Sequence, residues 1–198
     1  ASRYSIRPNE MTIMPTHSML WTIGHSTRPI DAFIAILRAW GIARLIDVRT
    51  IPRSRHNPQF NAESLTADLM QAGMIYVHIP GLGGLRKPRK DSPNKGWRNV
   101  SFRGYADYMQ TGQFATALEA LVTEAARLRV AIMCAEAVPW RCHRLLIADA
   151  LLSHGWEVQH ILSETNLRPH SLTSFAKLES GRVTYPEPSN STETPSLF

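Results

Sequence analysis

Short apolar runs alternate along this chain with longer segments that mix apolar and polar residues. The runs are brief and often β-branched, as expected of strands that are buried on both faces of a sheet. They lie at residues 20–23, 43–48, 74–79, 130–134 and 157–161. The pattern therefore predicts about five buried strands.

The segments between these runs have the spacing of amphipathic helices. They cover residues 29–40, 62–72, 103–110, 113–128 and 142–154. Pro29 is favoured in a first helical turn, and Asn61 is a good cap for the second helix. Gly155 is typical of the position just after a helix end. Strands that alternate with helices predict right-handed crossovers, and so a single-domain α/β fold with a mainly parallel sheet and helices on both faces.

Three segments depart from this alternation. Residues 1–18 have no clear periodicity and are expected to be an N-terminal arm before a single domain over 19–185. Residues 80–102 are longer than an ordinary strand-to-helix connection, which indicates a lid-like or binding loop, or a disordered one. Residues 186–198 are rich in Pro, Ser and Thr and are expected to be a flexible tail.

Composition bounds the class of protein. The 198 residues, 43% hydrophobic and 19% charged, suit one soluble globular domain. No run approaches the roughly 20 apolar residues of a membrane span, and the start lacks the layout of a secretory signal. Only two cysteines are present, which favours a reducing compartment, so we expect a cytoplasmic protein with no membrane partner.

The net charge of +6 favours a phosphate-bearing partner but does not identify it. Three arginines fall within residues 49–56, and four basic residues fall within 86–90. A solvated basic surface is the plain alternative. The position of these clusters in the fold has to decide between the two.

The polar residues gather where the predicted strands end. The carboxyl ends of parallel strands share one edge of a sheet, and ligands of open α/β sheets bind outside that edge. The segments that leave the strands are 24–29, 47–56, 78–84 and 134–144. The topology therefore predicts one crevice lined by all four.

Several residues of the first three segments suit the binding of an anion. A turn with Gly24, Ser26 and Thr27 before a helix is a ready anion site, although its hydroxyls could simply cap the helix. Arginine side chains suit bidentate binding of phosphate. The candidates of this kind are Arg49, Arg53 and Arg55. Gly83 and Gly84 permit close backbone approach to a ligand, and Asp47 beside Arg49 is a further candidate binding residue. Asp47 and Arg49 could instead form a structural ion pair.

The segment CAEAVPWRCHR (134–144) holds both cysteines. Cys134 ends a predicted strand, whereas Cys142 and His143 fall at a predicted helix start, where the positive helix end favours a thiolate. Either cysteine could be a nucleophile, with His25 or His143 as proton carrier. Glu136 is a candidate general acid or base, or an ion-pair partner of Arg141 or Arg144. Burial as inert core residues is the alternative for both cysteines.

Three more specific interpretations of this segment each conflict with its residue spacing or with the expected compartment. A phosphatase-type loop needs five residues between Cys and Arg, whereas six separate Cys134 from Arg141, and Pro139 lacks an N–H. A metal site would need Cys134, Cys142, His143 and a fourth ligand such as His25, and this spacing matches no standard zinc knuckle. A structural disulfide is disfavoured in a reducing compartment. We therefore predict no metal site.

Together these segments resemble the bacterial domain of unknown function 488 family. The matching elements are TIGHST (22–27), DVRTIPRSR (47–55) with Phe60, YVHIPGLGG (76–84), FRGYADYM (102–109) and LRVAIMCAEAVPWRCHR (128–144). The resemblance spans roughly residues 20–165 and implies a single α/β domain. Some members carry the label of DNA-repair protein, but the resemblance implies no particular reaction. Its motif residues coincide with the predicted crevice and add Tyr105 and Arg144 to the candidate binding residues.

The leading hypothesis is an enzyme or enzyme-like pocket that acts on a phosphate-bearing substrate, a nucleotide or nucleic acid. Trp97 in the 80–102 segment could then stack on a base. The competing hypothesis is a non-catalytic nucleic-acid-binding module, and a third is a cysteine-based redox or metal-binding protein. The sequence identifies no cofactor.

Overall fold

A computed structural model describes residues 19–188 of the chain. The predicted arm at 1–18 and most of the predicted tail, residues 189–198, lie outside the described residues. Among the described residues, no helix is long and apolar enough to cross a membrane.

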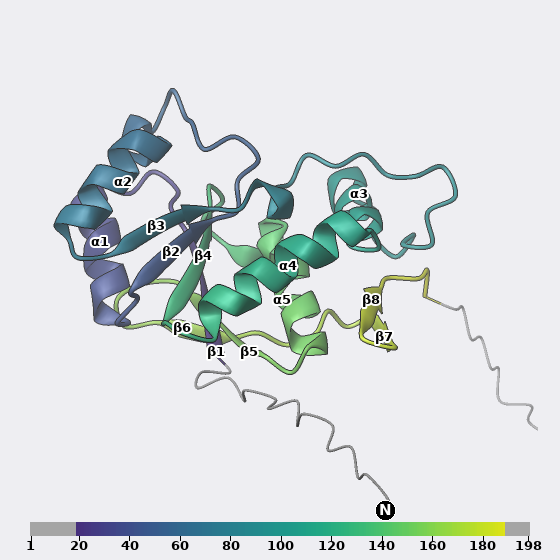
Figure 1. Cartoon of the computed structure of the whole chain (residues 1–198). Helices are drawn as coiled ribbons and strands as arrows, with labels where there is room; N and C mark the ends of the chain where they lie inside the picture. Colours follow the sequence, from purple (N-terminus) through teal and green to yellow (C-terminus); the bar gives the residue numbers. More distant parts are fainter. Residues whose placement is uncertain (1–18, 189–198) are drawn as a thin grey trace, which may run out of the picture.

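The centre of the protein is a six-stranded sheet (Figure 1). Its strands are β1 (Met19–Gly24), β2 (Arg44–Asp47), β3 (Ile75–His78), β4 (Val130–Cys134), β5 (Glu157–Ile161) and β6 (Leu167–Pro169). The order is β3-β2-β4-β1-β5-β6, and only β6 pairs antiparallel. This confirms the predicted α/β fold with a mainly parallel sheet. The sixth strand was not predicted, because Leu-Arg-Pro is too short and polar to form an apolar run.

The five predicted helices are present, and they cover both faces of the sheet (Figure 1). They are α1 (Ile30–Ala39), α2 (Ala62–Gln71), α3 (Val100–Tyr108), α4 (Gly112–Ala125) and α5 (Arg144–Ser153). Phe33 of α1 and Leu65 of α2 share a core cluster with Ile23 of the sheet. Leu118 of α4 and Leu146 of α5 belong to the cluster on the opposite face.

The chain reverses its direction of winding between β1 and β4. The crossover after β1 leads through α1 to β2, whereas the crossover after β4 leads through α5 to β5, on the other side of β1. The two strands are neighbours, with Gly24 opposite Cys134 at their carboxyl ends. This is the topological switch point at which open α/β sheets bind ligands.

The long segment after β3 is fastened to the domain. It begins with the short helix η2 (Pro80–Leu82) and continues irregularly to α3. Ser92 and Asn94 are buried within it, and both donate hydrogen bonds to the carboxylate of Asp107 in α3, over 2.6 and 2.8 Å. Asn94 also accepts a hydrogen bond from the backbone of Tyr185.

Trp97 does not face the candidate crevice. Its ring packs against Phe102, Phe175 and Tyr185, with ring centroids 4.8 to 5.5 Å away. The expectation that Trp97 stacks on a base is therefore wrong, because three aromatic neighbours already occupy its ring.

A buried chain of hydrogen bonds joins β1 to the C-terminal part of the domain. Thr22 contacts Nδ1 of His160 at 2.8 Å, and Nε2 of His160 lies 3.1 Å from Nδ1 of His170. Asp149 then accepts from Nε2 of His170 at 2.9 Å. Asp149 also accepts from Tyr185, which follows a hairpin of β7 (Lys177–Glu179) and β8 (Arg182–Thr184).

Candidate functional site

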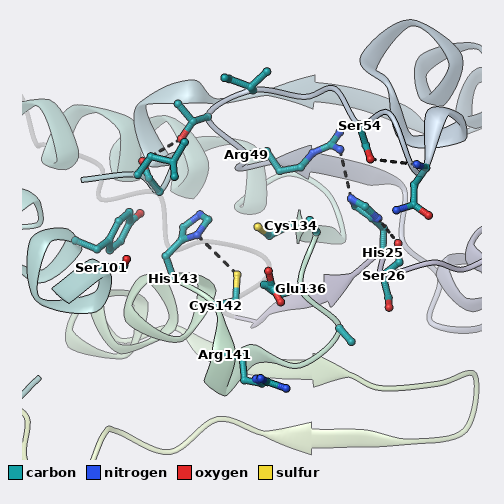
Figure 2. A pocket seen from close by; sticks show the side chains of 18 of the residues that line it. His25, Ser26, Arg49, Ser54, Ser101, Cys134, Glu136, Arg141, Cys142 and His143 are labelled. Atoms are coloured by element: carbon teal, nitrogen blue, oxygen red, sulfur yellow. Dashed lines mark hydrogen bonds between the residues drawn. The ribbon is translucent and has the colours of Figure 1, made fainter. Parts of the chain in front are cut away.

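A cavity of about 670 Å³ lies at the carboxyl ends of the parallel strands (Figure 2). Its walls come from the segments that follow β1, β2, β3 and β4, and from the first turns of α3. These are the four segments that were predicted to lie together at the carboxyl edge of the sheet.

Most of the candidate residues line this cavity. They are His25, Ser26, Thr27, Arg49, Arg53, Gly84, Tyr105, Cys134, Glu136, Cys142 and His143. The remaining candidates, Gly24, Asp47, Arg55, Gly83 and Arg144, do not line it. Asp47 and Arg144 are buried beneath it, and Arg55 is exposed outside it.

Gly24 lies in contact with the loop after β4. A Cβ atom at this position would come 1.8 Å from the carbonyl oxygen of Glu136. The next two backbone N–H groups extend the strand pairing, since His25 donates to Cys134 and Ser26 to Ala135. Ser26 has a φ of 51°, which is unusual for a residue with a side chain. The close contact between Gly24 and the loop after β4 therefore restricts the shape of this turn. The hydroxyl groups of Ser26 and Thr27 do not cap α1, which has no side-chain cap.

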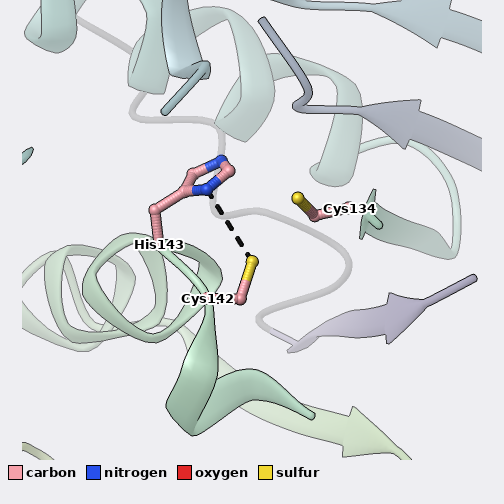
Figure 3. Close-up of side chains that lie close together, drawn as sticks. All are labelled: Cys134, Cys142 and His143. Atoms are coloured by element: carbon pink, nitrogen blue, oxygen red, sulfur yellow. Dashed lines mark hydrogen bonds between the residues drawn. The ribbon is translucent and has the colours of Figure 1, made fainter. Parts of the chain in front are cut away.

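Two sulfur atoms and an imidazole nitrogen meet at the base of the cavity (Figure 3). The ligand atoms of Cys134, Cys142 and His143 all lie within 4.8 Å of one another. Cys134 ends β4, and the loop that follows returns the chain so that Cys142 lies beside it at the start of α5. Both cysteines are free thiols, so the structure contains no disulfide between them. We call these three residues the sulfur cluster.

His143 is held so that one ring nitrogen faces the sulfur of Cys142. Its Nε2 atom lies 3.0 Å from the carbonyl oxygen of Val48. A carbonyl can only accept, so Nε2 carries the proton of this hydrogen bond. The Nδ1 atom lies 3.7 Å from the Sγ atom of Cys142, and the ring packs against Tyr105.

The two cysteines differ in acidity. Burial by itself raises the pKa of Cys142, but hydrogen bonds with Cys134 and His143 and the charge of Arg144 hold that pKa well below its usual range. The hydrogen bond to Cys142, together with burial, raises the pKa of Cys134. Arg144 donates from Nε to the Cys142 sulfur at 3.4 Å. Cys142 is therefore the more acidic thiol of the pair.

Arg49 is fully engaged by buried partners. Its guanidinium pairs with Asp47, with 2.5 Å between Nη2 and Oδ2, and it donates to the carbonyl of Phe60. Asp47 is completely buried and also accepts from Tyr76. The ion pair that the sequence offered as a structural alternative is thus present. Because its charge is compensated, Arg49 contributes little net positive potential to the cavity.

His25 is neutral, and both its ring nitrogens are occupied. Nδ1 donates to the carbonyl of Ser26 at 2.7 Å, and Nε2 accepts from Arg49 at 3.3 Å. Burial, together with the nearby positive charge of Arg49, lowers the pKa of His25 to about 4 against the opposing effect of the Ser26 bond. Its ring stacks on Phe60. These contacts make His143 the better placed proton carrier at the sulfur cluster.

Two arginines at the rim have no partner among residues 19–188. Arg53 and Arg141 are exposed, line the cavity, and make no hydrogen bond or ion pair through their side chains. The expected pairing of Glu136 with Arg141 or Arg144 is wrong. Arg144 instead donates to the backbone carbonyl of Glu136 at 2.5 Å, and the Glu136 carboxylate forms no ion pair within the described chain.

Some residues that line the cavity were not among the candidates predicted from the sequence. The missed side chains include Thr50, Ile51, Ser54, Asn57, Leu85, Ser101, Phe102 and Arg141. Ile51 and Leu85 are 65% and 84% exposed, and Leu85 has a φ of 58°. They lie in irregular loops, where no periodicity reveals orientation. Arg141 could have been found, since it belongs to the same segment as both cysteines.

The fold and the site define a doubly wound α/β protein with a polar pocket over a sulfur cluster at its switch point. A family model described as "Domain of unknown function DUF488" matches residues 29–151. The chain belongs to this family, as its motifs indicated. Comparison with curated proteins found no match, and neither did comparison with solved structures.

Proposed function

We propose that this protein is an enzyme that acts on a small phosphate-bearing substrate, such as a nucleotide, with the sulfur cluster as its reacting centre. The observation that carries the proposal is the convergence of Cys134, Cys142 and His143 at the base of a cavity whose rim holds unpaired arginines. A cavity of about 670 Å³ is within the usual size range for small-molecule sites.

Arg53 and Arg141 would bind the anionic part of the substrate. Both line the cavity, and neither side chain has a partner in the described chain. A guanidinium group binds phosphate through two parallel hydrogen bonds, which adds geometric selectivity to the charge. Arg49 would instead hold the neighbouring loop in place, because Asp47 already neutralises it.

The apolar part of the lining would receive the uncharged part of the substrate. Ile51 and Leu85 are exposed at the mouth, and Phe102 is half-buried in the wall. Exposed apolar side chains and unpaired arginines in one cavity suit a ligand that has a flat aromatic group beside a phosphate. A nucleotide has this combination.

Glu136 would move a proton during the reaction. It is the one carboxylate among the residues that line the cavity, and it is exposed to the cavity rather than paired. Cys142 would supply the reacting sulfur, with His143 adjacent to it. A general acid or base beside an activated centre is the usual minimum for group transfer or hydrolysis. A cytoplasmic setting, which keeps both thiols reduced, is part of this proposal.

A non-catalytic nucleic-acid-binding module is less well supported. Two of the four basic residues at 86–90 are engaged within the protein, since Arg86 lies over the ring of Tyr108 and Arg89 pairs with Asp91. Arg53 and Arg141, which have no partner in the described chain, line a cavity, and an enclosed site of this kind fits a small ligand better than an extended strand.

Titration calorimetry with inorganic phosphate and with nucleoside mono-, di- and triphosphates tests the proposal. We expect at least one nucleotide to bind, and the double variant Arg53→Ala/Arg141→Ala to lose about tenfold or more in affinity. Arg127→Ala, at an exposed arginine outside the cavity, is the matched control. Failure of every phosphate compound to bind would refute the proposal. Binding only to DNA or RNA, with a steep dependence on salt, would favour the nucleic-acid-binding module.

A further inference from the structure

We infer that Cys134, Cys142 and His143 bind a zinc ion or another thiophilic divalent cation, with one coordination position open to the cavity. The inference deepens the proposed function, because it names the cofactor of the same reacting centre. The spacing of these residues in the sequence matched no zinc knuckle and predicted no metal site. The structure differs from that prediction because the three residues are brought together by the fold and not by a short sequence motif.

The positions of the three ligand atoms suit a tetrahedral metal site. Zinc binds thiolate sulfur at about 2.3 Å and imidazole nitrogen at about 2.0–2.1 Å, so neighbouring ligand atoms of one zinc ion lie roughly 3.5–3.8 Å apart. Here Cys142 Sγ and His143 Nδ1 are 3.7 Å apart, and all three ligand atoms are within 4.8 Å of one another (Figure 3). Small side-chain rotations would bring them to a common ion.

The surrounding contacts orient these ligands as metal ligands are usually oriented. A metal-binding histidine typically donates its other ring N–H to a carbonyl or carboxylate. His143 does so through Nε2 to Val48, 3.0 Å away, which leaves Nδ1 directed toward the sulfurs. Arg144 donates from Nε to the sulfur of Cys142 and would stabilise its charge as a ligand.

The cluster offers three protein ligands and no fourth. No other His, Cys, Asp or Glu of residues 19–188 belongs to it, and His25 is held by Ser26 and Arg49 instead. Structural zinc sites are usually closed by four protein ligands, whereas catalytic sites keep one position for water or substrate. All three ligand residues line the cavity, so the open position would face the substrate.

Metal titration of the full chain tests this inference. The protein is prepared without an affinity tag, kept reduced, stripped of metal and titrated with Co²⁺ and Cd²⁺, with Zn²⁺ as competitor. The chain contains two cysteines, so any sulfur-to-metal charge-transfer absorption must come from Cys134 and Cys142. We expect one Co²⁺ per chain, with the visible spectrum of a tetrahedral site and a thiolate charge-transfer band, and displacement by Zn²⁺.

Variants assign the ligands. Cys134→Ser and Cys142→Ser should each lower the charge-transfer intensity, and His143→Gln should retain it. All three should weaken Co²⁺ binding by more than the roughly 10- to 100-fold that loss of an outer partner costs. His56→Asn removes an exposed histidine whose side chain makes no hydrogen bond or ion pair in the described chain, and it should bind like the wild type. Circular dichroism checks that each variant is folded.

Two results would overturn the metal site. One is the absence of Co²⁺, Cd²⁺ and Zn²⁺ binding by the reduced wild-type protein, which would leave the cluster as free thiols. The other is metal binding that all three ligand variants retain. Neither result depends on a substrate, so the metal site and the phosphate-binding proposal can fail separately.

Discussion

Arg144 donates a hydrogen bond from its Nε atom to the sulfur of Cys142 across 3.4 Å, and both side chains are almost completely buried. The same guanidinium binds the backbone carbonyl of Glu136. One buried cation therefore fixes the sulfur at the base of the cavity and also the loop that carries the cavity's carboxylate. These two contacts accommodate a large charged side chain that lies in the core without a carboxylate partner among the described residues.

The unequal acidity of the cysteines predicts an order of alkylation. In the reduced, metal-free protein, Cys142 should react with iodoacetamide before Cys134 and at lower pH. Hydrogen bonds and Arg144 lower the pKa of Cys142 against the effect of burial, whereas the bond to Cys142 and burial raise that of Cys134. Mass spectrometry of the two peptides across pH measures this. Faster alkylation of Cys134 at neutral pH would contradict the assignment of Cys142 as the more acidic thiol.

Replacement of Gly24 by alanine should disturb the loop after β4. The new Cβ would meet the Glu136 carbonyl at 1.8 Å, so backbone must move, and overpacking of this kind costs about 1–3 kcal/mol or more. Gly112→Ala is the matched control, since a Cβ there has nothing within 4 Å. Urea unfolding should show a clear loss of stability for Gly24→Ala alone. Equal stability of the two variants would show that the contact is not restrictive.

Two arginines of the cavity should respond differently to substitution. Arg49→Met leaves the completely buried Asp47 without its cation, which typically costs about 3–5 kcal/mol. Arg53→Met removes an exposed side chain without a partner and should change stability by less than about 0.5 kcal/mol. Thermal or urea unfolding of both variants measures the difference. A mild effect of Arg49→Met would mean that the ion pair is not needed for folding.

Stability should fall as the pH drops below about 6.5. Burial and the Arg49 charge lower the pKa of His25 to about 4, and burial and His170 lower that of His160 to about 3. The unfolded chain therefore takes up protons below pH 6.5 that the folded protein does not. For His25 alone the loss amounts to roughly 3 kcal/mol by pH 4.

Unfolding free energies measured between pH 7 and 4 test this linkage. His160→Gln should flatten the dependence, because it removes a histidine whose pKa is lowered in the folded protein. A slope that His160→Gln leaves unchanged would show that His160 takes up its proton equally well in the folded protein.

The positions of the strands could be predicted because buried parallel strands are continuous apolar runs. Cys134 was correctly placed at the end of a strand from the run VAIMC alone. The edge location of the pocket followed from strand direction. These inferences need only local sequence and the rules of parallel topology.

The contacts inside the site could not be predicted, because they depend on how the loops fold. Glu136 was expected to pair through its carboxylate, yet Arg144 binds its backbone carbonyl, which sequence does not encode by residue type. Trp97 looked free in a long polar loop, but residues 175 and 185 reach it from the far end of the chain. Likewise, nothing local indicates that Leu85 lies at the cavity mouth.

Protection of Cys142 from alkylation is the most direct test of the central claim, that a phosphate-bearing substrate binds in the cavity over the sulfur cluster. The rate of alkylation by iodoacetamide is measured in the reduced, metal-free protein with and without each nucleotide that binds in calorimetry. The account predicts that a bound nucleotide slows alkylation of Cys142, and that Arg53→Ala/Arg141→Ala removes this protection. An unchanged alkylation rate at saturating nucleotide would place the nucleotide elsewhere and contradict the account.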